Sequence, residues 1–335
     1  MPTDPGPDPT TPLVYVTRPL PEPATAPLAA AGLAVRQHEP DRPPTADELR
    51  AGVADAAALV CLLTDRVDGD LLDAAPGLRV VANVAVGFDN IDVAACTERG
   101  VVATNTPGVL TEATADLAWA LLLAAARRVG EGERLVRSGG WEGWSPTQLV
   151  GQPVHGRTIG IVGMGAIGTA VARRARGFGM EVLYASRSPR PEAEAGTGAR
   201  RVPLDELLAT ADVVSLHTPL TPETRHLIDA AALARMKPTA ILVNTARGPV
   251  VDEVALVEAL RTGRIAAAGL DVFEREPALA DGLAELDNAV VLPHLGSATT
   301  EARAAMVGLA CANVVAVLAG GEPPTPLNPE VLGRG

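Results

Sequence analysis

The sequence predicts an α/β protein built from two Rossmann-like, doubly wound parallel-sheet domains with an inter-domain cleft. Short apolar strands alternate with helical stretches in two series, one before about residue 105 and one from about residue 155. Such alternation is typical of parallel sheets whose faces are covered by helices. The chain has 335 residues, which is enough for two domains of ordinary size.

The composition limits both the core and the partners. Hydrophobic residues make up 47% of the chain but aromatic residues only 2%, so the core must consist of Ala, Val and Leu. The net charge of −12 argues against nucleic acid or an anionic membrane as a partner, and any phosphate site must be a local basic feature. Cys61, Cys96 and Cys311 are widely spaced and odd in number. We therefore expect buried, reduced thiols in a cytoplasmic protein without a metal site.

The first series is expected to form the substrate domain, because it contains no glycine fingerprint. Residues 1–11 are rich in proline and have no apolar pattern, so we expect a disordered lead-in. Strands are expected at residues 13–16, 33–35, 58–63, 78–82 and 101–103, and helices at 27–31, 46–53 and 69–75.

Two long apolar helices are expected where the chain crosses between the lobes. The first covers residues 111–128, with Thr111 as its cap and a wide apolar face for the core and a subunit interface. The second covers residues 299–319 and contains Glu301 and Arg303, so we do not expect it to span a membrane.

The second series opens with a dinucleotide fingerprint, Gly163-x-Gly165-x-x-Gly168, between a strand at 158–162 and a helix at 166–178. Gly163 permits the tight turn, Gly165 lets the backbone approach a pyrophosphate, and Gly168 lets the helix pack on the strand. The helix N-terminus then presents N–H groups and its positive dipole end to the phosphates. An ordinary structural turn is the alternative, but both flanking elements have the form that a nucleotide site requires.

The rest of the second series continues the alternation. Strands are expected at residues 181–184, 213–216, 240–243, 267–270 and 290–292, and helices at 205–209 and 252–260, the latter capped by Asp252. The proline-rich tail at 321–329 is expected to end the fold.

The loop after the strand at 181–184 favours NADP(H) over NAD(H). A fold that prefers NAD carries Asp or Glu there, about 20 residues past the glycines, to bind the ribose 2′-hydroxyl. This chain offers Ser186, Arg187, Ser188 and Arg190 instead, whose hydroxyl and guanidinium groups suit a 2′-phosphate. A solvated surface loop is the alternative, and NAD(H) stays open as a cofactor.

Three polar residues follow strands of the second series, at the sheet edge where open α/β folds bind ligands. Arg247, Glu276 and His294 have the chemistry that reduction of a 2-keto acid needs. Arg247 can bind the carboxylate and polarise the carbonyl, and His294 can donate the proton because imidazole titrates near neutrality. Glu276 would fix which ring nitrogen faces the substrate. Taken singly, each residue has a structural alternative to a catalytic role: a surface Arg, a solvated Glu and a core His. A further histidine at a strand end, His217, is expected near the cofactor rather than in catalysis.

Six motifs, in order along the chain, resemble those of the D-isomer-specific 2-hydroxyacid dehydrogenases, and the resemblance runs from about residue 13 to about residue 327. They are VGFDNID at 86–92, TPGVLT at 106–111, GMGAIG at 163–168, NTARG at 244–248, GLDVF at 269–273 with EP at 276–277, and LPHLGSA at 292–298. Within that family the chain looks most like the glyoxylate/hydroxypyruvate reductases, because of LLTD at 62–65, GGW at 139–141 and the Arg187 loop.

The resemblance implies an NADPH-dependent reduction of a small 2-keto acid to the D-2-hydroxy acid, with His294 as proton donor. It implies a discontinuous substrate domain at 12–108 and 299–335, a dinucleotide-binding domain at 109–298, and a homodimer built through the latter. The expected catalytic residues are Arg247, Glu276 and His294, and the expected substrate-binding residues are Val86, Gly87, Arg247, His294, Leu63 and Trp141. The expected cofactor-binding residues are Gly163, Met164, Gly165, Ala166, Ile167, Gly168, Ser186, Arg187, Ser188, Arg190, His217, Pro219, Thr245, Asp271 and Gly296.

Two alternatives to this interpretation stay open. The first is another D-2-hydroxyacid dehydrogenase, acting on phosphoglycerate or on a bulkier 2-keto acid. The second is a nucleotide-sensing, corepressor-like binding module, since fold alone does not fix function. Trp141, which matches a residue reaching a partner's active site, could equally be a simple packing anchor.

Overall fold

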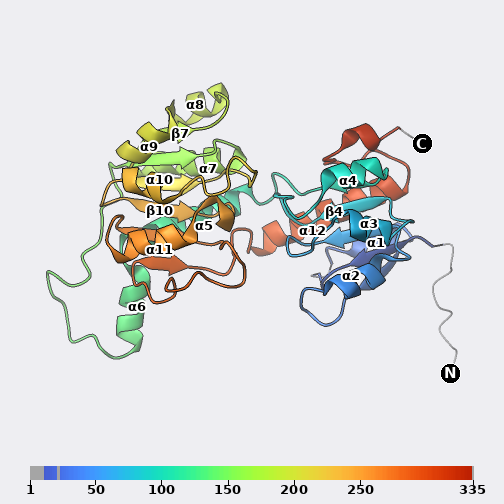
Figure 1. Ribbon diagram of the computed structural model, residues 1–335, viewed down its shortest axis with the longest axis horizontal. Coiled ribbons are helices and arrows are strands. Elements are labelled where there is room, and N and C mark those ends of the chain that lie inside the picture. The colour runs from blue at the N-terminus through green and yellow to red at the C-terminus, as the bar shows by residue number, and fades with distance from the viewer. Residues whose placement is uncertain (1–10, 21–22, 334–335) are drawn as a thin grey trace. The chain divides into compact units, whose positions relative to one another are not determined.

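The computed structural model describes residues 11–20 and 23–333, which form two compact units (Figure 1). The first unit comprises Met1–Leu110 with Thr299–Gly335, and the second comprises Thr111–Ala298. The family resemblance places the first boundary two residues earlier, between 108 and 109. Residues 1–10 of the expected disordered lead-in lie outside the described residues.

The first unit is built on a parallel five-stranded sheet in the order β2-β1-β3-β4-β5. This is one of the two common doubly wound strand orders. The strands are β1 (Leu13–Val16), β2 (Ala34–Gln37), β3 (Ala58–Cys61), β4 (Val80–Asn83) and β5 (Val102–Thr104). The helices are α1 (Ala26–Ala30), α2 (Ala46–Val53), α3 (Gly69–Asp73), α4 (Val93–Glu98) and α12 (Thr300–Leu318). As expected, Cys61, Cys96 and Cys311 are buried and free.

Helix α12 is a core element of the first unit. In the described part of the chain it is the one helix that could cross a membrane by length and composition alone. It packs against β3, β4 and α1, and Met306, Val307 and Val314 are buried. Thr299 caps it by accepting a hydrogen bond from the Ala302 N–H. This packing accounts for the apolar residues on the buried side of the helix.

The tail at 321–329, expected to end the fold, packs back against β5. Asn328 is fully buried. Its side-chain oxygen accepts a hydrogen bond from Ala103 N at 2.8 Å, and its Nδ2 donates to Val101 O at 2.9 Å. The tail therefore satisfies backbone groups that the edge strand would otherwise leave unpaired.

The second unit is built on a parallel seven-stranded sheet in the order β12-β11-β10-β9-β6-β7-β8. The winding reverses between β6 and β9, which makes this pair the switch point of a Rossmann fold. The strands are β6 (Thr158–Val162), β7 (Glu181–Ala185), β8 (Arg200–Arg201), β9 (Val213–Leu216), β10 (Ile241–Asn244), β11 (Ala267–Leu270) and β12 (Ala289–Val291). Two doubly wound parallel sheets confirm the predicted fold class.

Helices cover both faces of this sheet (Figure 1). The helices of the unit are α5 (Thr111–Ala126), α6 (Val129–Arg137), α7 (Ala166–Ala175), α8 (Pro191–Thr197), α9 (Leu204–Thr210), α10 (Ala230–Arg235) and α11 (Glu253–Arg261), of which α6 buries no residue. Along β6, Ile159 and Ile161 join the core formed with α5 and α7, whereas a Cβ on Gly160 would meet Leu207 of α9. Alternate residues of one strand thus serve two cores, which is why the strand is apolar throughout.

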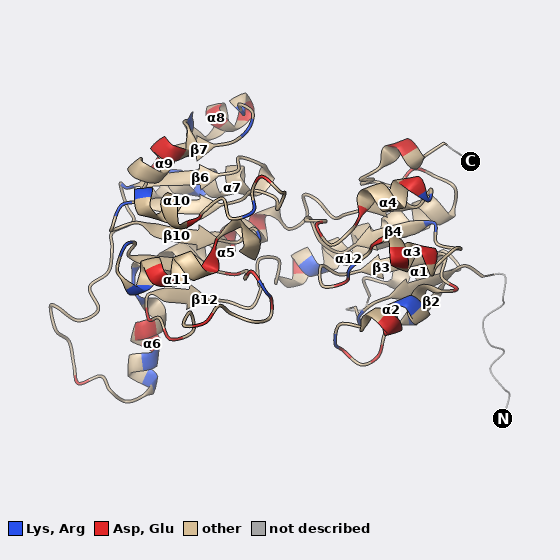
Figure 2. Ribbon diagram, in the orientation of Figure 1, with Lys and Arg blue, Asp and Glu red and all other residues tan. Residues whose placement is uncertain are grey.

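Several short elements were not predicted: α4, α6, α8, β8 and α10. The helix expected at 111–128 ends at Ala126, because Arg128 adopts a left-handed backbone with φ 54° and a new helix, α6, begins at Val129. Thr111 is the first helical residue rather than the cap. α6 carries acid in its first turn and Arg134 and Arg137 in its last, as the helix dipole favours (Figure 2).

Candidate active site

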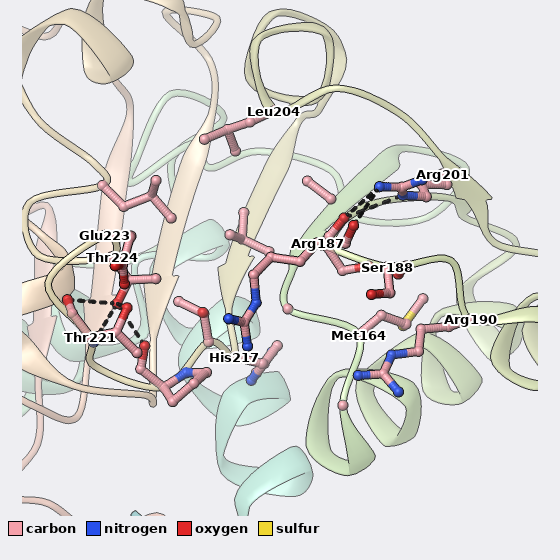
Figure 3. A pocket seen from close by; sticks show the side chains of 18 of the residues that line it. Met164, Arg187, Ser188, Arg190, Arg201, Leu204, His217, Thr221, Glu223 and Thr224 are labelled. Carbon is pink, nitrogen blue, oxygen red and sulfur yellow. Dashed lines mark hydrogen bonds between the residues drawn. The ribbon is translucent and has the colours of Figure 1, made fainter. Parts of the chain in front are cut away.

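A pocket of about 1070 Å³ lies at the carboxyl ends of β6, β7 and β9, beside the switch point (Figure 3). Nine expected cofactor residues line it: Gly163, Met164, Gly165, Ser186, Arg187, Ser188, Arg190, His217 and Pro219. The other six expected cofactor residues, Ala166, Ile167, Gly168, Thr245, Asp271 and Gly296, do not. The pocket is large enough for part of a dinucleotide.

The glycine turn between β6 and α7 brings backbone segments close together. Gly163 has φ 97°, and a Cβ there would lie 2.5 Å from the carbonyl oxygen of His217. A Cβ on Gly168 would lie 2.2 Å from the Gly163 oxygen, so the helix can approach the strand only without a side chain. A Cβ on Gly165 would meet nothing within 4 Å, which leaves room at the start of α7 for a phosphate.

His217 contributes a half-buried polar side chain to the wall of the pocket. Its Nε2 lies 2.8 Å from the Ser215 hydroxyl, and burial lowers the pKa of the imidazole to about 4. Among the described residues, no partner reaches its buried Nδ1 or the buried hydroxyl of Thr245. Unpaired buried polar atoms are costly, so both positions fit contacts to a bound group.

The loop after β7 is basic and folded on itself. The Ser186 hydroxyl donates to the Ser188 carbonyl at 2.5 Å, and the Arg190 N–H donates to the Tyr184 hydroxyl at 2.9 Å. Arg187 extends its side chain across the pocket toward His217 (Figure 3). On the opposite wall, hydrogen bonds from the Thr221 side chain and from the backbone of Glu223, helped by the charge of Arg187, hold the pKa of Glu223 below its usual range.

The structure brings His294 and Glu276 into contact. His294 Nδ1 lies 2.9 Å from Glu276 Oε2, and the Phe273 N–H donates to Glu276 Oε1 at 3.0 Å. Burial raises the pKa of Glu276, but the hydrogen bond and charge of His294, helped by Phe273 and Arg247, outweigh it and leave the pKa lowered. The carboxylate is therefore ionised at neutral pH, and it turns Nε2 of the imidazole away from itself.

Asp271 holds the His294 loop. Its buried carboxylate accepts hydrogen bonds from Leu295 N at 2.6 Å and Gly296 N at 2.7 Å, and its carbonyl accepts one from His294 N at 2.9 Å. Burial raises the pKa of Asp271 in spite of the two N–H donors. His294 itself has φ 55°, a conformation that a non-glycine residue adopts only when its surroundings enforce it.

Arg247 follows β10 and begins a 3-10 turn, Gly248–Val250. Its backbone carbonyl accepts a hydrogen bond from Asn244 Nδ2 at 2.9 Å, and its Nη1 donates to the Ala246 carbonyl at 2.9 Å. Since its charge contributes to the lowered pKa of Glu276, the three residues expected to be catalytic share one electrostatic environment at the carboxyl edge of the sheet.

A family model described as "D-isomer specific 2-hydroxyacid dehydrogenase, NAD binding domain" matches residues 119–296, which include the glycine turn, Arg247, Glu276 and His294. The chain belongs to the D-isomer specific 2-hydroxyacid dehydrogenase family. As a 2-hydroxyacid dehydrogenase it is an NAD(P)-dependent oxidoreductase that interconverts a keto acid and a hydroxy acid.

Several relatives in the family match this chain over nearly its whole length. The glyoxylate reductase of Thermococcus onnurineus is 52% identical over 96% of this chain and 97% of that relative. The glyoxylate reductase of Pyrococcus furiosus is 50% identical over 96% of each chain. The crystal structure of an NADPH-dependent glyoxylate/hydroxypyruvate reductase from Sinorhizobium meliloti, in complex with NADP and malonate, is 36% identical with a TM-score of 0.85, covering 97% of this chain and 99% of that one.

The expected substrate residues of this dehydrogenase lie in both units. Val86 and Gly87 follow β4, where Asn105 Nδ2 donates to the Val86 carbonyl at 2.8 Å and Asn83 Nδ2 donates to the Gly87 carbonyl at 2.9 Å. Those bonds fix the carbonyls of the loop. Leu63 follows β3 in the same unit, whereas Trp141 belongs to the second unit, in the loop after α6, and is 53% exposed.

The pocket of the dehydrogenase also has lining residues that the sequence pattern did not indicate, among them Arg201, Glu223 and Thr224. Arg201 lies on β8, a strand of two residues that no periodicity could indicate. Glu223 and Thr224 belong to the loop after Pro219, whose sequence, TPLTPET, reads as an ordinary turn. No group of three or more potential metal ligands occurs among the described residues.

Proposed function

We propose that the enzyme reduces glyoxylate or hydroxypyruvate to the D-2-hydroxy acid with NADPH. The 2.9 Å contact between His294 Nδ1 and Glu276 Oε2 carries the proposal, because it leaves Nε2 as the nitrogen that can face a substrate. Two relatives that are about half identical to this chain, those of Thermococcus onnurineus and Pyrococcus furiosus, are named glyoxylate reductases, which supports the choice of substrate.

The chain's own residues supply binding, polarisation and a proton. The reduced nicotinamide, when bound, supplies the hydride for C2 of the keto acid. Arg247 binds the carboxylate and draws electron density toward the keto oxygen, which favours attack at C2. His294 donates the Nε2 proton to that oxygen, and Glu276 stabilises the protonated ring through Nδ1. In the first unit, which we propose as the substrate domain, the Val86 and Gly87 N–H groups hold the carboxylate.

The proposed cofactor is NADP(H), with NAD(H) as the weaker alternative. The room beyond Gly165 suits a pyrophosphate, and Ser186, Arg187 and Ser188 suit a 2′-phosphate. Residues 185–190, at the end of β7 and in the loop after it, include no carboxylate that would bond a 2′-hydroxyl and repel a phosphate.

An assay with both reduced cofactors tests the proposal. Purified protein is given NADPH or NADH with glyoxylate, hydroxypyruvate, a bulkier 2-keto acid or phosphohydroxypyruvate, and cofactor oxidation is followed. The highest kcat/KM should come from NADPH with glyoxylate or hydroxypyruvate, and His294→Ala should lose most of the turnover. Preference for phosphohydroxypyruvate or a bulky keto acid would move the enzyme to another branch of the family. Absence of turnover, with a stoichiometric protein partner on purification, would favour a binding module.

We further propose a homodimer built through the second unit. The exposed apolar side chains Val136, Trp141, Trp144 and Val150 lie on α6 and the following loop, and Trp144 is 83% exposed. Light scattering should give twice the chain mass of 34.3 kDa. Trp144→Asp should give the monomer, and Val254→Asp, at another exposed apolar position on α11, should not. A wild-type monomer would refute the dimer.

A further inference from the structure

Arg201 donates hydrogen bonds to the backbone of the loop that follows β7. Its Nε and Nη2 donate to the Ser186 carbonyl at 3.3 and 2.9 Å, and Nη2 also donates to the Arg187 carbonyl at 3.0 Å (Figure 3). It reaches them from β8, where it pairs in register with Tyr184 of β7. One guanidinium therefore spans two consecutive peptide groups at the point where the loop leaves the strand.

At its other end the loop is held by a hydrogen bond to Tyr184. This side chain is fully buried, and its hydroxyl accepts a hydrogen bond from Arg190 N at 2.9 Å while donating to Glu194 Oε1 at 2.6 Å. Ser186 closes the turn internally by donating to the Ser188 carbonyl. With Arg201 on the first two carbonyls, the Ser186–Arg190 segment has fixed contacts at both ends before any ligand arrives.

The orientation of these backbone carbonyls affects whether the pocket can bind an anion. A carbonyl oxygen that turned toward a phosphate would repel it, and Arg201 satisfies two such oxygens with charged donors. Arg201 also adds positive charge: the pocket is lined by Arg187, Arg190 and Arg201 against one carboxylate, Glu223. The side chain of Arg187 extends toward His217, whereas Arg201 lies on the other side of the turn (Figure 3).

We propose that Arg201 is a positioning residue for cofactor selectivity: it holds the Ser186–Ser188 turn in the form that accepts a 2′-phosphate. The proposal rests on the proposed preference for NADP(H). It assigns to Arg201 an indirect role through two backbone carbonyls, distinct from the direct phosphate contacts proposed for Ser186, Arg187 and Ser188. Its planar fork, rather than its charge alone, is what the role requires.

The test measures nucleotide fragments as well as turnover. Binding of 2′-AMP and 5′-AMP is measured by calorimetry for the wild type, Arg201→Ala, Arg201→Lys and Arg200→Ala. Arg200 is the matched control, since it is the neighbour on β8, points to the other face and pairs with Glu206 and Glu181. Arg201→Ala should weaken 2′-AMP about tenfold and 5′-AMP less than about twofold, as expected for lost hydrogen bonds to a charged group. The KM for NADPH should rise in parallel, with kcat and the KM for NADH nearly unchanged.

The remaining outcomes separate the two proposals. A wild type that binds both nucleotides equally would overturn the NADP(H) preference and, with it, this role. A wild type that selects 2′-AMP, together with an Arg201→Ala variant that selects it equally well, would overturn the role of Arg201 alone. Full recovery in Arg201→Lys would reduce the effect to charge and contradict the positioning role. Unchanged melting temperatures and NADH kinetics show that each variant is folded, and Arg200→Ala should match the wild type.

Discussion

The carboxylate of Asp271 binds the backbone N–H of Gly296 at 2.7 Å, two residues beyond the histidine that we propose as proton donor. Its second oxygen binds the Leu295 N–H at 2.6 Å. The two oxygens of one carboxylate thus hold the segment in which His294 keeps its left-handed backbone. Because such a conformation persists only under constraint, the orientation of the imidazole depends on Asp271.

Asp271→Asn should therefore damage both stability and activity. The amide can accept at one position only, and its NH₂ group would face a backbone N–H, so about 2 kcal/mol of unfolding free energy should be lost. We expect kcat to fall about tenfold or more because the imidazole loses its orientation. Denaturant unfolding and steady-state kinetics measure the two effects. A variant with wild-type kcat would show that the loop keeps its form without the carboxylate.

Glu276→Gln should change the pH dependence of catalysis. The ionised carboxylate orients the imidazole and its pKa is lowered, so wild-type kcat/KM should fall in acid as pH drops through that pKa, whereas glutamine cannot titrate and the variant should lack this acid limb. Glu285→Gln, at an exposed position, is the control and should leave the profile unchanged. The same profile in both variants would contradict the role of Glu276.

The pair also links stability to pH with a defined sign. The pKa of Glu276 is lowered in the folded state, so its contribution is present above the ordinary carboxyl pKa and is lost as pH falls through the lowered value. The difference in unfolding free energy between wild type and Glu276→Gln should therefore be constant near neutrality and shrink below about pH 4.

His217 should make the protein less stable in mild acid. Its folded pKa is about 4 against 6.5 for the free side chain, so between these values the unfolded state binds the extra proton. Stability should fall by up to about 3 kcal/mol as pH drops from 6.5 to 4. His217→Asn should flatten this slope, and His155→Gln, at an exposed position, should not. Parallel stability curves for all three proteins would rule out the burial effect.

Arg247→Lys should keep the charge but lose the forked geometry. We expect the KM for the keto acid to rise and kcat to fall, with kcat/KM reduced about 100-fold, because the proposed contacts polarise the carbonyl in the transition state. The affinity for NADPH, measured by fluorescence titration, should change little. Arg235→Lys, on the exposed side of α10, is the control. An equal loss of NADPH affinity would place Arg247 in the cofactor site instead.

Asn328→Leu should destabilise the first unit without touching the chemistry. The side chain is fully buried and bonded to Ala103 N, Val101 O and Thr97 Oγ1. Leaving these groups unpaired should cost about 3 kcal/mol. The thermal transition should move down, and NADPH binding below that transition should remain normal. Loss of NADPH affinity at low temperature would contradict this separation.

Local patterns predicted the parts of the fold whose cause is local. Asp252 caps α11 through the Ala255 N–H, and the glycine turn lies between β6 and α7 as its spacing requires. Arg247, Glu276 and His294 were recognised because each lies in the segment that follows an apolar strand, and parallel strands end at a common edge. Chemistry that sits at strand ends is accessible to sequence reasoning for this reason.

The features that the sequence pattern did not predict depend on contacts between distant segments or on single backbone angles. Arg201 acts on Ser186 only because β8 pairs with β7, and a strand of two residues leaves no periodic signal. The break between α5 and α6 comes from the left-handed backbone of Arg128, inside a stretch whose composition suits a continuous helix. Asn328 was not recognised within the proline-rich tail, because its hydrogen bonding depends on β5, which lies more than 200 residues earlier.

The first unit is assembled from two segments that are separated by all of the second. Helix α12 covers β3 and β4, and Asn328 completes the hydrogen bonding beside β5, yet these pieces are translated after residue 298. The contiguous second unit can fold on the ribosome as soon as it emerges, while the amino-terminal sheet must wait with an apolar face uncovered. Nascent chains stalled before α12 should therefore be the species that chaperones bind and that aggregates form from.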